Sequence, residues 1–594
     1  MGAASAGAGP TFAALLESRL RPAVAEFGGG EARVQPVGDS RFGDYQTNIA
    51  MTLAKAQRTN PRELAARIIA KLEVDDVCAP PEVAGAGFIN FRLKAEALAT
   101  RVARMLGDPR LGVPLPATAK RIVIDFSGPN IAKAMHVGHI RSTILGDAIA
   151  RVAEFLGHSV VRDNHIGDWG TQFGMLLVGW KTMLEREALA RDPIAELERL
   201  YKAVVARCET DPPLREVAKS ELVKLQGGDE ENLATWRQMI ALSHAQFAEI
   251  YRRLEIRFDV ELGESFYNPW LNRVVSQLRD RGIARESEGA ICVFSDGTLP
   301  PKEDPFLIQR DGEWLPVPAL ILKEDGGANY TTTDLATLEY RLTQWNPDEI
   351  IYVTDGRQQL HFRQVFAIFR RWQPEAARTR LAHVWFGSIL GENHKPFKTR
   401  SGESVKLADL LDEAEERAFA LISEKSIELT EEERRDIART VGLGAVKYAD
   451  LLPNRQSDYV FSWDKMLSFQ GNTAPYLQYS YVRICSIFRK AGLDRVPTGH
   501  QEAIFLPEGG EQALAKKLCQ FGEVLPLVLD DHRPNVLANY LYELAAAFHA
   551  FFEACPVLKA DAPLRASRLV LCQVTARVLA QGLALLGISV PERM

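Results

Sequence analysis

The sequence predicts a protein of class α/β, in which a doubly wound parallel sheet follows a small α+β domain and precedes a long helical region. Residues 121–170 alternate strand, helix and strand signals, the pattern of a parallel βαβ unit. Residues 185–255 are helical in pattern and highly charged, as expected of an insertion. From about residue 405 to the end the apolar spacing is almost wholly helical.

Size and charge limit the functions open to the chain. A chain of 594 residues is too long to fold around a single hydrophobic core, and at about 150 residues per domain its length suggests about four domains. Hydrophobic residues make up 46% and charged residues 25%, which excludes a disordered or fibrous protein. The net charge of -6 argues against a general nucleic-acid coat, so any polyanion must bind a local basic surface.

The seven cysteines stand singly, without the spacing of a disulfide framework or a zinc site. We therefore expect no disulfide, no zinc and no other structural metal. The amino terminus is rich in small residues but has no basic flank followed by a long apolar run, and we expect no membrane-spanning stretch later in the chain. These features predict a cytoplasmic protein that binds no membrane.

The domain order follows from these patterns. In the first domain, helices are expected over 12–27 and 61–72, and Ile89, Phe91 and Leu93 share one face of a strand. The predicted segments are a flexible start (1–10), an amino-terminal domain (11–110), a linker (111–120), the α/β domain (121–404) with its insertion at about 185–255, a helical stem (405–465) and a helical domain (466–594).

The parallel sheet begins with the β-branched run at 121–127, which Gly128 and Pro129 end. A helix follows over 138–155, and residues 159–170 return as a buried strand that runs into a polar loop. We expect the sheet to be completed by about residue 390 through further strands at 290–294, 319–323, 349–354 and 383–389. Loops are expected near 453–464 and 491–510.

The sharpest local motif is His136-Val137-Gly138-His139, between the end of a strand and the start of a helix. Unpaired N–H groups and the helix dipole attract phosphates there, and a glycine lets a ligand approach the backbone. An isolated motif of this kind is more often a pair of helix-capping histidines. The strand, turn and helix context favours a nucleotide site instead, in which the imidazoles stabilise charge on the phosphates.

Longer runs of sequence resemble the arginyl-tRNA synthetases of class I. The runs FSGPNIAKAMHVGHIRSTILGDAIARVAEFLGH and HIGDWGTQFGML carry the resemblance most strongly. Others are YTTTDLATLEYR, GRQQLHFRQVF, HVWFGSILG, KPFKTRSGESVKLADLL, GNTAPYLQYSYVRICSIFRK and, nearer the amino terminus, FGDYQTNIAM. The resemblance implies a Rossmann-like class I catalytic domain, an additional amino-terminal domain that touches tRNA, and an all-helical anticodon-binding domain.

The resemblance also implies roles at the nucleotide site. His136 and His139 would contact the ATP phosphates, and Gly138 would lie under the adenine. The family's usual lysine-rich loop corresponds to KPFKTRSG, where Ser401 stands at the position of the second lysine. In arginine enzymes that lack this lysine, another lysine just before the histidine motif substitutes for it. By resemblance Lys133 stands at that position. The alternative interpretation of Lys133 is a solvated lysine in a loop. The other candidates for the pyrophosphate contact are Lys395, Lys398 and Arg400.

Selection of arginine requires carboxylates that meet a planar, permanently charged guanidinium. By resemblance, Tyr330 and Asp334 contact the side chain, and Asn130 and Gln358 hold the α-amino or carboxylate end. Glu264 matches a further acidic position of the family. Taken alone, Asp334 would more often be a helix cap, and Glu264 could equally be a surface glutamate. Family members often have serine at the position of Gly128 and glutamate at that of Asp125, so we carry over no contacts from those two positions.

An acceptor surface for tRNA is expected near residues 475–490, where tyrosines alternate with cations on a predicted helix. Tyrosines at such spacing are otherwise usually core residues. The candidate contacts are Tyr476, Tyr479, Arg483, Arg489 and Lys490.

The implied reaction has two steps: arginine is adenylated by ATP, and the arginyl group then passes to the 2′-hydroxyl of the terminal adenosine of tRNA(Arg). The resemblance implies that tRNA must be bound before arginine is activated. Mg²⁺ is expected with ATP, without a site made by protein alone, and the chain is expected to be a monomer. Two alternatives are a different nucleotidyltransferase on the same fold and a catalytically silent tRNA-binding relative.

Overall fold

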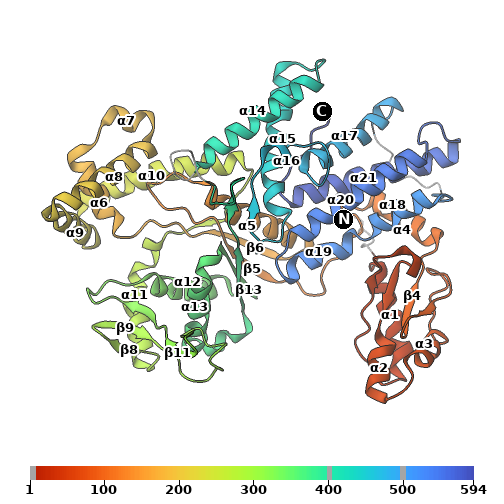
Figure 1. Ribbon diagram of the computed structural model, residues 1–594, viewed down its shortest axis with the longest axis horizontal. Coiled ribbons are helices and arrows are strands. Elements are labelled where there is room, and N and C mark those ends of the chain that lie inside the picture. The colour runs from red at the N-terminus through yellow and green to blue at the C-terminus, as the bar shows by residue number, and fades with distance from the viewer. Residues whose placement is uncertain (1–8, 398–404, 495–502) are drawn as a thin grey trace, which may run out of the picture. The chain divides into compact units, whose positions relative to one another are not determined.

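The computed structural model describes residues 9–397, 405–494 and 503–594. The chain forms two compact units. One comprises residues 1–117, 418–448 and 464–594, and the other comprises residues 118–417 and 449–463. Figure 1 shows the elements of both.

The second unit is built around a five-stranded parallel sheet, which confirms the predicted doubly wound fold. Helix α5 (Val137–Leu156) connects the two strands of the sheet that come first in the chain, and α13 (Gln359–Trp372) connects the two that come last. Because these connections run in opposite directions from the middle of the sheet, the winding reverses there. The strands, in spatial order, are β14 (Arg380–Phe386), β13 (Glu349–Asp355), β5 (Arg121–Asp125), β6 (Ser159–Asn164) and β7 (Val260–Glu261).

Two of the strands that we expected in this sheet lie elsewhere. β9 (Ala290–Val293) and β12 (Ala319–Leu322) form a separate antiparallel sheet with β8 (Ala284–Ser287). A two-residue turn at Glu288 and Gly289, both with positive φ, joins β8 to β9 and imposes the antiparallel pairing. The apolar runs identified the strands but carried no information about their partners. A short hairpin, β10 (Leu307–Arg310) and β11 (Glu313–Pro316), lies between β9 and β12 in the chain.

The charged segment at about 185–255 is helical, as predicted. The side chain of Asp192 caps α8 by accepting the N–H of Ala195 at 3.0 Å, and that of Asp229 caps α10 in the same way from Asn232. These helices pack on α6, which follows the loop after β6. The bounds are α6 (Gln172–Met183), α7 (Arg186–Arg191), α8 (Pro193–Thr210), α9 (Pro212–Gln226) and α10 (Glu230–Arg253).

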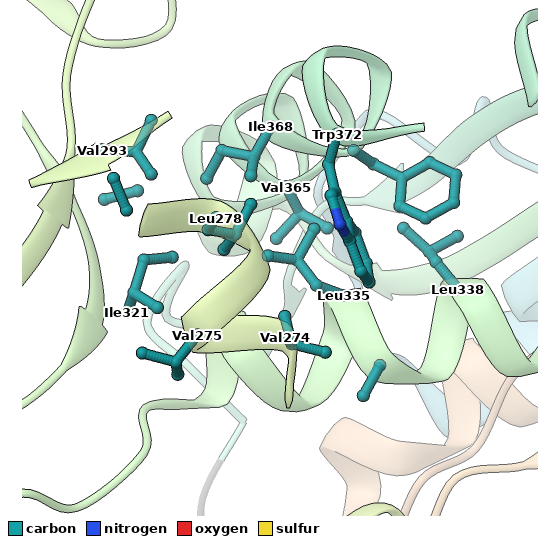
Figure 2. Close-up of a cluster of buried hydrophobic side chains, with 14 of the residues drawn as sticks. Val274, Val275, Leu278, Val293, Ile321, Leu335, Leu338, Val365, Ile368 and Trp372 are labelled. Carbon is teal, nitrogen blue, oxygen red and sulfur yellow. The ribbon is translucent and has the colours of Figure 1, made fainter. Parts of the chain in front are cut away.

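A single apolar core packs three helices of this unit together. Val274 and Leu278 of α11 (Glu264–Asp280) meet Leu335 of α12 (Tyr330–Trp345) and Ile368 of α13, and Trp372 is fully buried among them (Figure 2). The Trp372 ring nitrogen donates to Oε1 of Gln277 at 3.0 Å, so its one polar atom is also satisfied. The starts of α11, α12 and α13 are therefore carried by a single packed core.

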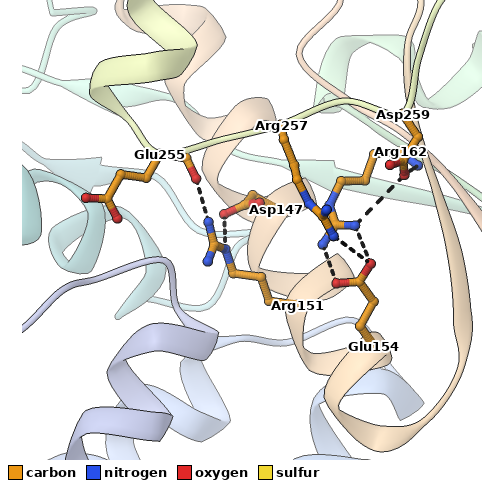
Figure 3. Close-up of polar contacts among 7 residues, drawn as sticks. All are labelled: Asp147, Arg151, Glu154, Arg162, Glu255, Arg257 and Asp259. Carbon is orange, nitrogen blue, oxygen red and sulfur yellow. Dashed lines mark hydrogen bonds and ion pairs between the residues drawn. The ribbon is translucent and has the colours of Figure 1, made fainter.

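Helix α5 is tied to its neighbours by charged contacts, shown in Figure 3. Arg151 binds Asp147 at 2.6 Å and also donates to the carbonyl of Glu255 at 2.6 Å. Arg162, which is almost fully buried in β6, donates to Glu154 at 2.8 Å. This hydrogen bond lowers the pKa of the Glu154 carboxyl. The carboxyl half of α5 is thus held against β6 and the segment that leads into β7.

The amino-terminal part of the first unit is the predicted α+β domain. Ile89, Phe91 and Leu93 are all buried, as expected from their shared face. The antiparallel sheet has the order β1 (Gln35–Pro36), β2 (Tyr45–Thr47), β4 (Phe88–Phe91), β3 (Glu82–Ala84). The helices are α1 (Phe12–Ala25), α2 (Ile49–Gln57), α3 (Pro61–Ile69) and α4 (Ala95–Gly107).

Beyond residue 405 the described chain is largely helical, as predicted. The exception is β16 (Tyr459–Val460), which pairs with β15 (Ile389–Leu390) inside a segment that we expected to be a loop. The helices are α14 (Leu407–Lys425), α15 (Glu431–Leu451), α16 (Trp463–Met466), α17 (Ala474–Lys490), α18 (Gly509–Cys519), α19 (Phe521–Asp530), α20 (Asn535–Ala554) and α21 (Ala562–Leu585).

Helix α21 is long and apolar enough to cross a membrane by length and composition, which the sequence analysis missed. However, 67% of its most apolar window is buried, and it packs on α17, α18 and α20. This burial is typical of the core helix of a globular domain.

Candidate active site

A cavity of about 670 Å³ opens at the carboxyl ends of β5, β6 and β13, where the winding of the sheet reverses. Open parallel sheets bind their ligands at this position. Eight of the predicted site residues line it, namely Asn130, His136, Gly138, His139, Glu264, Tyr330, Asp334 and Gln358. The structure therefore brings together residues that lie up to 228 positions apart in the chain.

The histidine motif forms the start of α5 and lines the cavity. The N–H of Gly138 donates to Nδ1 of His136 at 3.0 Å, and the N–H of His136 donates to Nδ1 of His139 at 3.1 Å. Each Nδ1 is an acceptor, so in the neutral ring the proton sits on Nε2. These rings, whose centroids are 4.0 Å apart, therefore cap the helix, and they also line the cavity in which the nucleotide is predicted to bind.

Both histidines are neutral near pH 7. Burial lowers the pKa of His139 to about 3, with the neighbouring His136 ring as a second cause. Burial, and then the charge of Lys133, lower the pKa of His136. The rings can act as neutral N–H donors at the positive end of the α5 helix dipole, an arrangement suited to an anionic ligand.

The loop after β5 is held in an uncommon conformation. Ser127 has a φ of 75°, and its N–H donates to Oγ of Ser142 at 2.9 Å while its hydroxyl contacts that of Tyr251 at 2.8 Å. Further on, Asn130 lies against Gly167: a Cβ at residue 167 would stand 2.2 Å from the Asn130 side-chain oxygen. Gly167 therefore leaves the space that Asn130 occupies at the cavity wall.

Two acidic residues reach the cavity from helix starts. Glu264 is the first residue of α11, and the N–H of its neighbour Ser265 donates to Asp168 at 2.8 Å, which anchors this end of the helix. Asp334 lies one turn after Tyr330 on α12, and the predicted shared face of these two residues is confirmed. Asn329, not Asp334, caps this helix, by accepting the Tyr330 N–H at 2.9 Å.

Burial and neighbouring carboxylates dominate the electrostatics of Glu264. Burial first, and then the charges of Asp334 and Asp168, raise the pKa of Glu264 to about 8. A helix start ordinarily favours an ionised carboxylate, so burial and the like charges outweigh the dipole here. Glu264 is thus a half-buried cavity residue, which excludes the surface interpretation.

Other acids next to the cavity are already paired. Arg341, fully buried in α12, binds Asp125 at 2.7 Å and Asp163 at 2.9 Å. Its guanidinium also lies 5.0 Å from the ring centroid of Tyr352. Asp125 and Asp163 share this cation, and Asp355 pairs with Arg357, so Glu264 and Asp334 are the acids lining the cavity that have no arginine or lysine partner among the described residues.

Lys133 and Lys395, the two predicted lysines among the described residues, do not line the cavity. The Lys133 ammonium is exposed and lies 5.6 Å from the ring centroid of Tyr201 in the insertion, although its charge acts on His136. Lys395 is exposed in the turn after β15, and its N–H donates to Asn393. Lys398, Arg400 and Ser401 lie outside the described residues.

The sequence analysis did not identify several lining residues as functional, namely His165, Thr333, Thr354, Asp355, Arg357 and His361. His361 is the most informative, because its Nε2 contacts Oδ2 of Asp334 at 2.6 Å. His165, Arg357 and His361 lie within runs that carried the family resemblance, so that resemblance was the available signal. Among the described residues, no group of three or more histidine, cysteine or acidic side chains could hold a metal ion.

The candidate tRNA surface on α17 is partly exposed. Tyr479 is 41% exposed, and the Arg483 guanidinium lies 5.8 Å from its ring and 5.0 Å from that of Phe552. Arg483 also donates to Nδ1 of His549 at 2.9 Å. Arg489 and Lys490 are exposed at the end of the helix, and Tyr476 is half-buried. The core interpretation is therefore wrong for Tyr479.

Three family descriptions match the chain. "tRNA synthetases class I (R), catalytic domain" matches residues 102–463, "DALR anticodon binding domain" matches 477–594, and "Arginyl tRNA synthetase N terminal domain" matches 12–93. An arginine–tRNA ligase of Cellvibrio japonicus is 47% identical, over 98% of this chain and 99% of that protein.

Solved structures agree with these matches. An arginyl-tRNA synthetase of Plasmodium falciparum superposes with a TM-score of 0.82 at 30% identity, over 98% of this chain and 99% of that chain. That of Thermus thermophilus gives a TM-score of 0.81 at 26% identity, over 98% and 100%.

Proposed function

Since the chain belongs to the arginyl-tRNA synthetases of class I, we propose that its cavity adenylates L-arginine with ATP and that the arginyl group then passes to the terminal adenosine of tRNA(Arg). In the first step the arginine carboxylate attacks the α-phosphate in line, and the bond to the leaving pyrophosphate breaks. In the second step a ribose hydroxyl of the tRNA, the 2′-hydroxyl in this proposal, takes the arginyl group and AMP leaves. These steps need no nucleophilic side chain.

One observation carries the assignment of arginine as substrate. Glu264 and Asp334 share a cavity in which no cation offsets them fully, and the pKa of Glu264 is raised to about 8 as a result of burial and of nearby carboxylates. A guanidinium would offset this charge with directed hydrogen bonds. Tyr330 lies one helical turn from Asp334, while Asn130 and Gln358 are left for the amino or carboxylate end of the substrate.

The start of α5 is the proposed site of the ATP phosphates. The dipole at the start of α5 and two neutral imidazoles would stabilise negative charge that builds on the α-phosphate and on pyrophosphate. Gly138 would leave room for the adenine. Lys133 would supply the positive charge that the family's lysine-rich loop otherwise provides, with Lys395, Lys398 and Arg400 as the alternative source.

Mg²⁺ would enter with ATP, held mainly by phosphate oxygens, as is usual for this ion. Within the anticodon-binding domain, the surface formed by Tyr476, Tyr479, Arg483, Arg489 and Lys490 would contact tRNA by stacking and by phosphate contacts. A monomeric, cytoplasmic enzyme that binds no membrane, and the domain boundaries given above, are part of the same proposal.

Exchange of pyrophosphate into ATP tests the function. We expect exchange with arginine and with none of the other amino acids, and only when tRNA is present. Exchange supported by another amino acid would assign a different substrate, and exchange with arginine but without tRNA would contradict the tRNA requirement alone. Binding of tRNA with no exchange under any condition would indicate a silent relative.

The Asp334→Ala variant tests the arginine pocket. Removing one partner of a buried charge pair costs about 3–5 kcal/mol, so the KM for arginine should rise by more than about a hundredfold. The matched control is Glu339→Gln on the same helix, because Glu339 pairs with Arg273 and does not line the cavity. An unchanged KM for arginine in the Asp334 variant would place that residue outside the pocket.

A further inference from the structure

His361 touches both of the α12 residues that are proposed to bind the arginine side chain. It lies in the first turn of α13, and its Nε2 is 2.6 Å from Oδ2 of Asp334. Its ring also meets the edge of the Tyr330 ring, with 4.7 Å between centroids. One side chain from a neighbouring helix therefore contacts both members of the proposed pair.

The contact with Asp334 is directional. Nε2 carries a proton when the ring donates, so this hydrogen bond engages Oδ2 and leaves Oδ1 for a ligand. Among the described residues, His361 is the hydrogen-bonding partner of Asp334. A guanidinium meets a carboxylate in a planar, forked geometry, so the rotation of that carboxylate decides how well the two groups fit.

The backbone positions behind this contact are rigid. Leu335, next to Asp334, and Phe362, next to His361, are both buried in the core that joins α12 to α13, part of which Figure 2 shows. The side chains of His361 and Asp334 are 15% and 17% exposed, so the hydrogen bond is largely protected from water. The His361–Asp334 pair thus continues the packed contact between α12 and α13 into the cavity.

We propose that His361 is a positioning residue for arginine recognition: it donates from Nε2 to Asp334, packs against Tyr330, and holds the carboxylate in the orientation that a guanidinium requires. This inference rests on the proposed function, and it adds a residue that does not itself have to touch the substrate. The essential property of His361 in this proposal is its hydrogen-bond donor rather than the bulk of its ring.

Three variants separate these properties. His361→Phe keeps a ring next to Tyr330 but removes the donor, His361→Gln keeps an N–H donor at a similar reach, and His361→Ala removes both. The matched control is His158→Gln, because His158 lies at the amino end of β6, away from the cavity, where its Nδ1 accepts the Lys120 N–H at 3.2 Å. Each variant is assayed in full-length form for tRNA charging, with KM for arginine and ATP, kcat, and the midpoint of thermal unfolding.

A hydrogen bond to a charged group predicts a KM for arginine raised about tenfold or more in the Phe and Ala variants. We expect kcat and the KM for ATP to stay within about threefold, and the Gln variant and the control to match the wild type within the same limit. A wild-type KM for arginine in the Phe variant, or a Gln variant no better than Phe, would overturn the inference. If Ala unfolds, the Phe and Gln pair still decides. A wild-type protein that does not charge tRNA with arginine would instead overturn the proposed function.

Discussion

Arginine binding should depend on pH through Glu264. The pKa of this carboxyl is raised to about 8, first by burial and then by the charges of Asp334 and Asp168. A guanidinium beside it favours the ionised form, so the pKa falls when arginine binds. Below pH 8 the free protein therefore holds a proton that the complex does not, and binding must release it.

The magnitude follows from the value of the pKa. At pH 7, one unit below it, only about one Glu264 in ten is ionised, so ionisation costs about 1.4 kcal/mol and weakens arginine binding about tenfold relative to pH 9. The Kd for arginine should fall by nearly a decade per unit as pH rises toward 8 and should level off above it. His136 and His139 do not contribute in this range, because the pKa values of both are lowered.

Titration calorimetry measures both quantities. Arginine is titrated between pH 6.5 and 8.5, at each pH in two buffers of different ionisation enthalpy, so that the difference in heat gives the number of protons released. We expect nearly one proton released at pH 7 and little release at pH 8.5. In Glu264→Gln the release should vanish and the Kd should become nearly independent of pH. A wild-type Kd that is flat across this range, with no proton release, would refute the reasoning.

Three further outcomes are expected. Lys133→Ala should slow adenylate formation at least about tenfold with little change in the Kd for tRNA, measured by single-turnover kinetics and filter binding; an unaltered rate would favour the 395–402 loop. Tyr479→Ala should weaken tRNA binding by about 1–3 kcal/mol, if a base stacks there, without changing the arginine Kd; equal tRNA affinity would exclude this stacking contact. Trp372→Ala should lower the free energy of unfolding of its unit by about 3–5 kcal/mol in urea, because a fully buried indole is removed; a loss under 1 kcal/mol, roughly the cost of a surface change, would contradict the packing described for this core.

The parts of the site that local sequence encodes could be predicted. His136, Gly138 and His139 lie between a strand and a helix, and that local order already places them at a helix start. The same holds for Tyr330 and Asp334, whose spacing of one turn puts them on one face once a helix is assumed. The structure adds that His136 and His139 both accept backbone N–H groups and line the cavity, so helix capping does not exclude a nucleotide site.

Features that depend on tertiary contacts could not be predicted. The strands β9 and β12 were found from their apolar runs, but their pairing depends on a tight turn and on what else covers them. The hydrogen bond of His361 to Asp334 joins two helices across 27 positions, and no local spacing indicates it. Lys133 follows the family pattern in sequence, yet its ammonium lies next to Tyr201 of the insertion, whose placement the motif does not contain.

The charges at the cavity show most clearly why the presence of acidic residues alone does not define a binding site. Asp125, Asp163, Glu264 and Asp334 all lie in or beside it, and the sequence treats them alike. Arg341 follows Asp334 by seven residues, two helical turns, so one helix brings an acid to the cavity and a guanidinium to the ends of β5 and β6. Asp125 and Asp163 share that guanidinium, whereas Glu264 and Asp334 have no arginine or lysine partner among the described residues. In the proposed function the substrate guanidinium meets these two acids, so the internal arginine would determine where the external one binds.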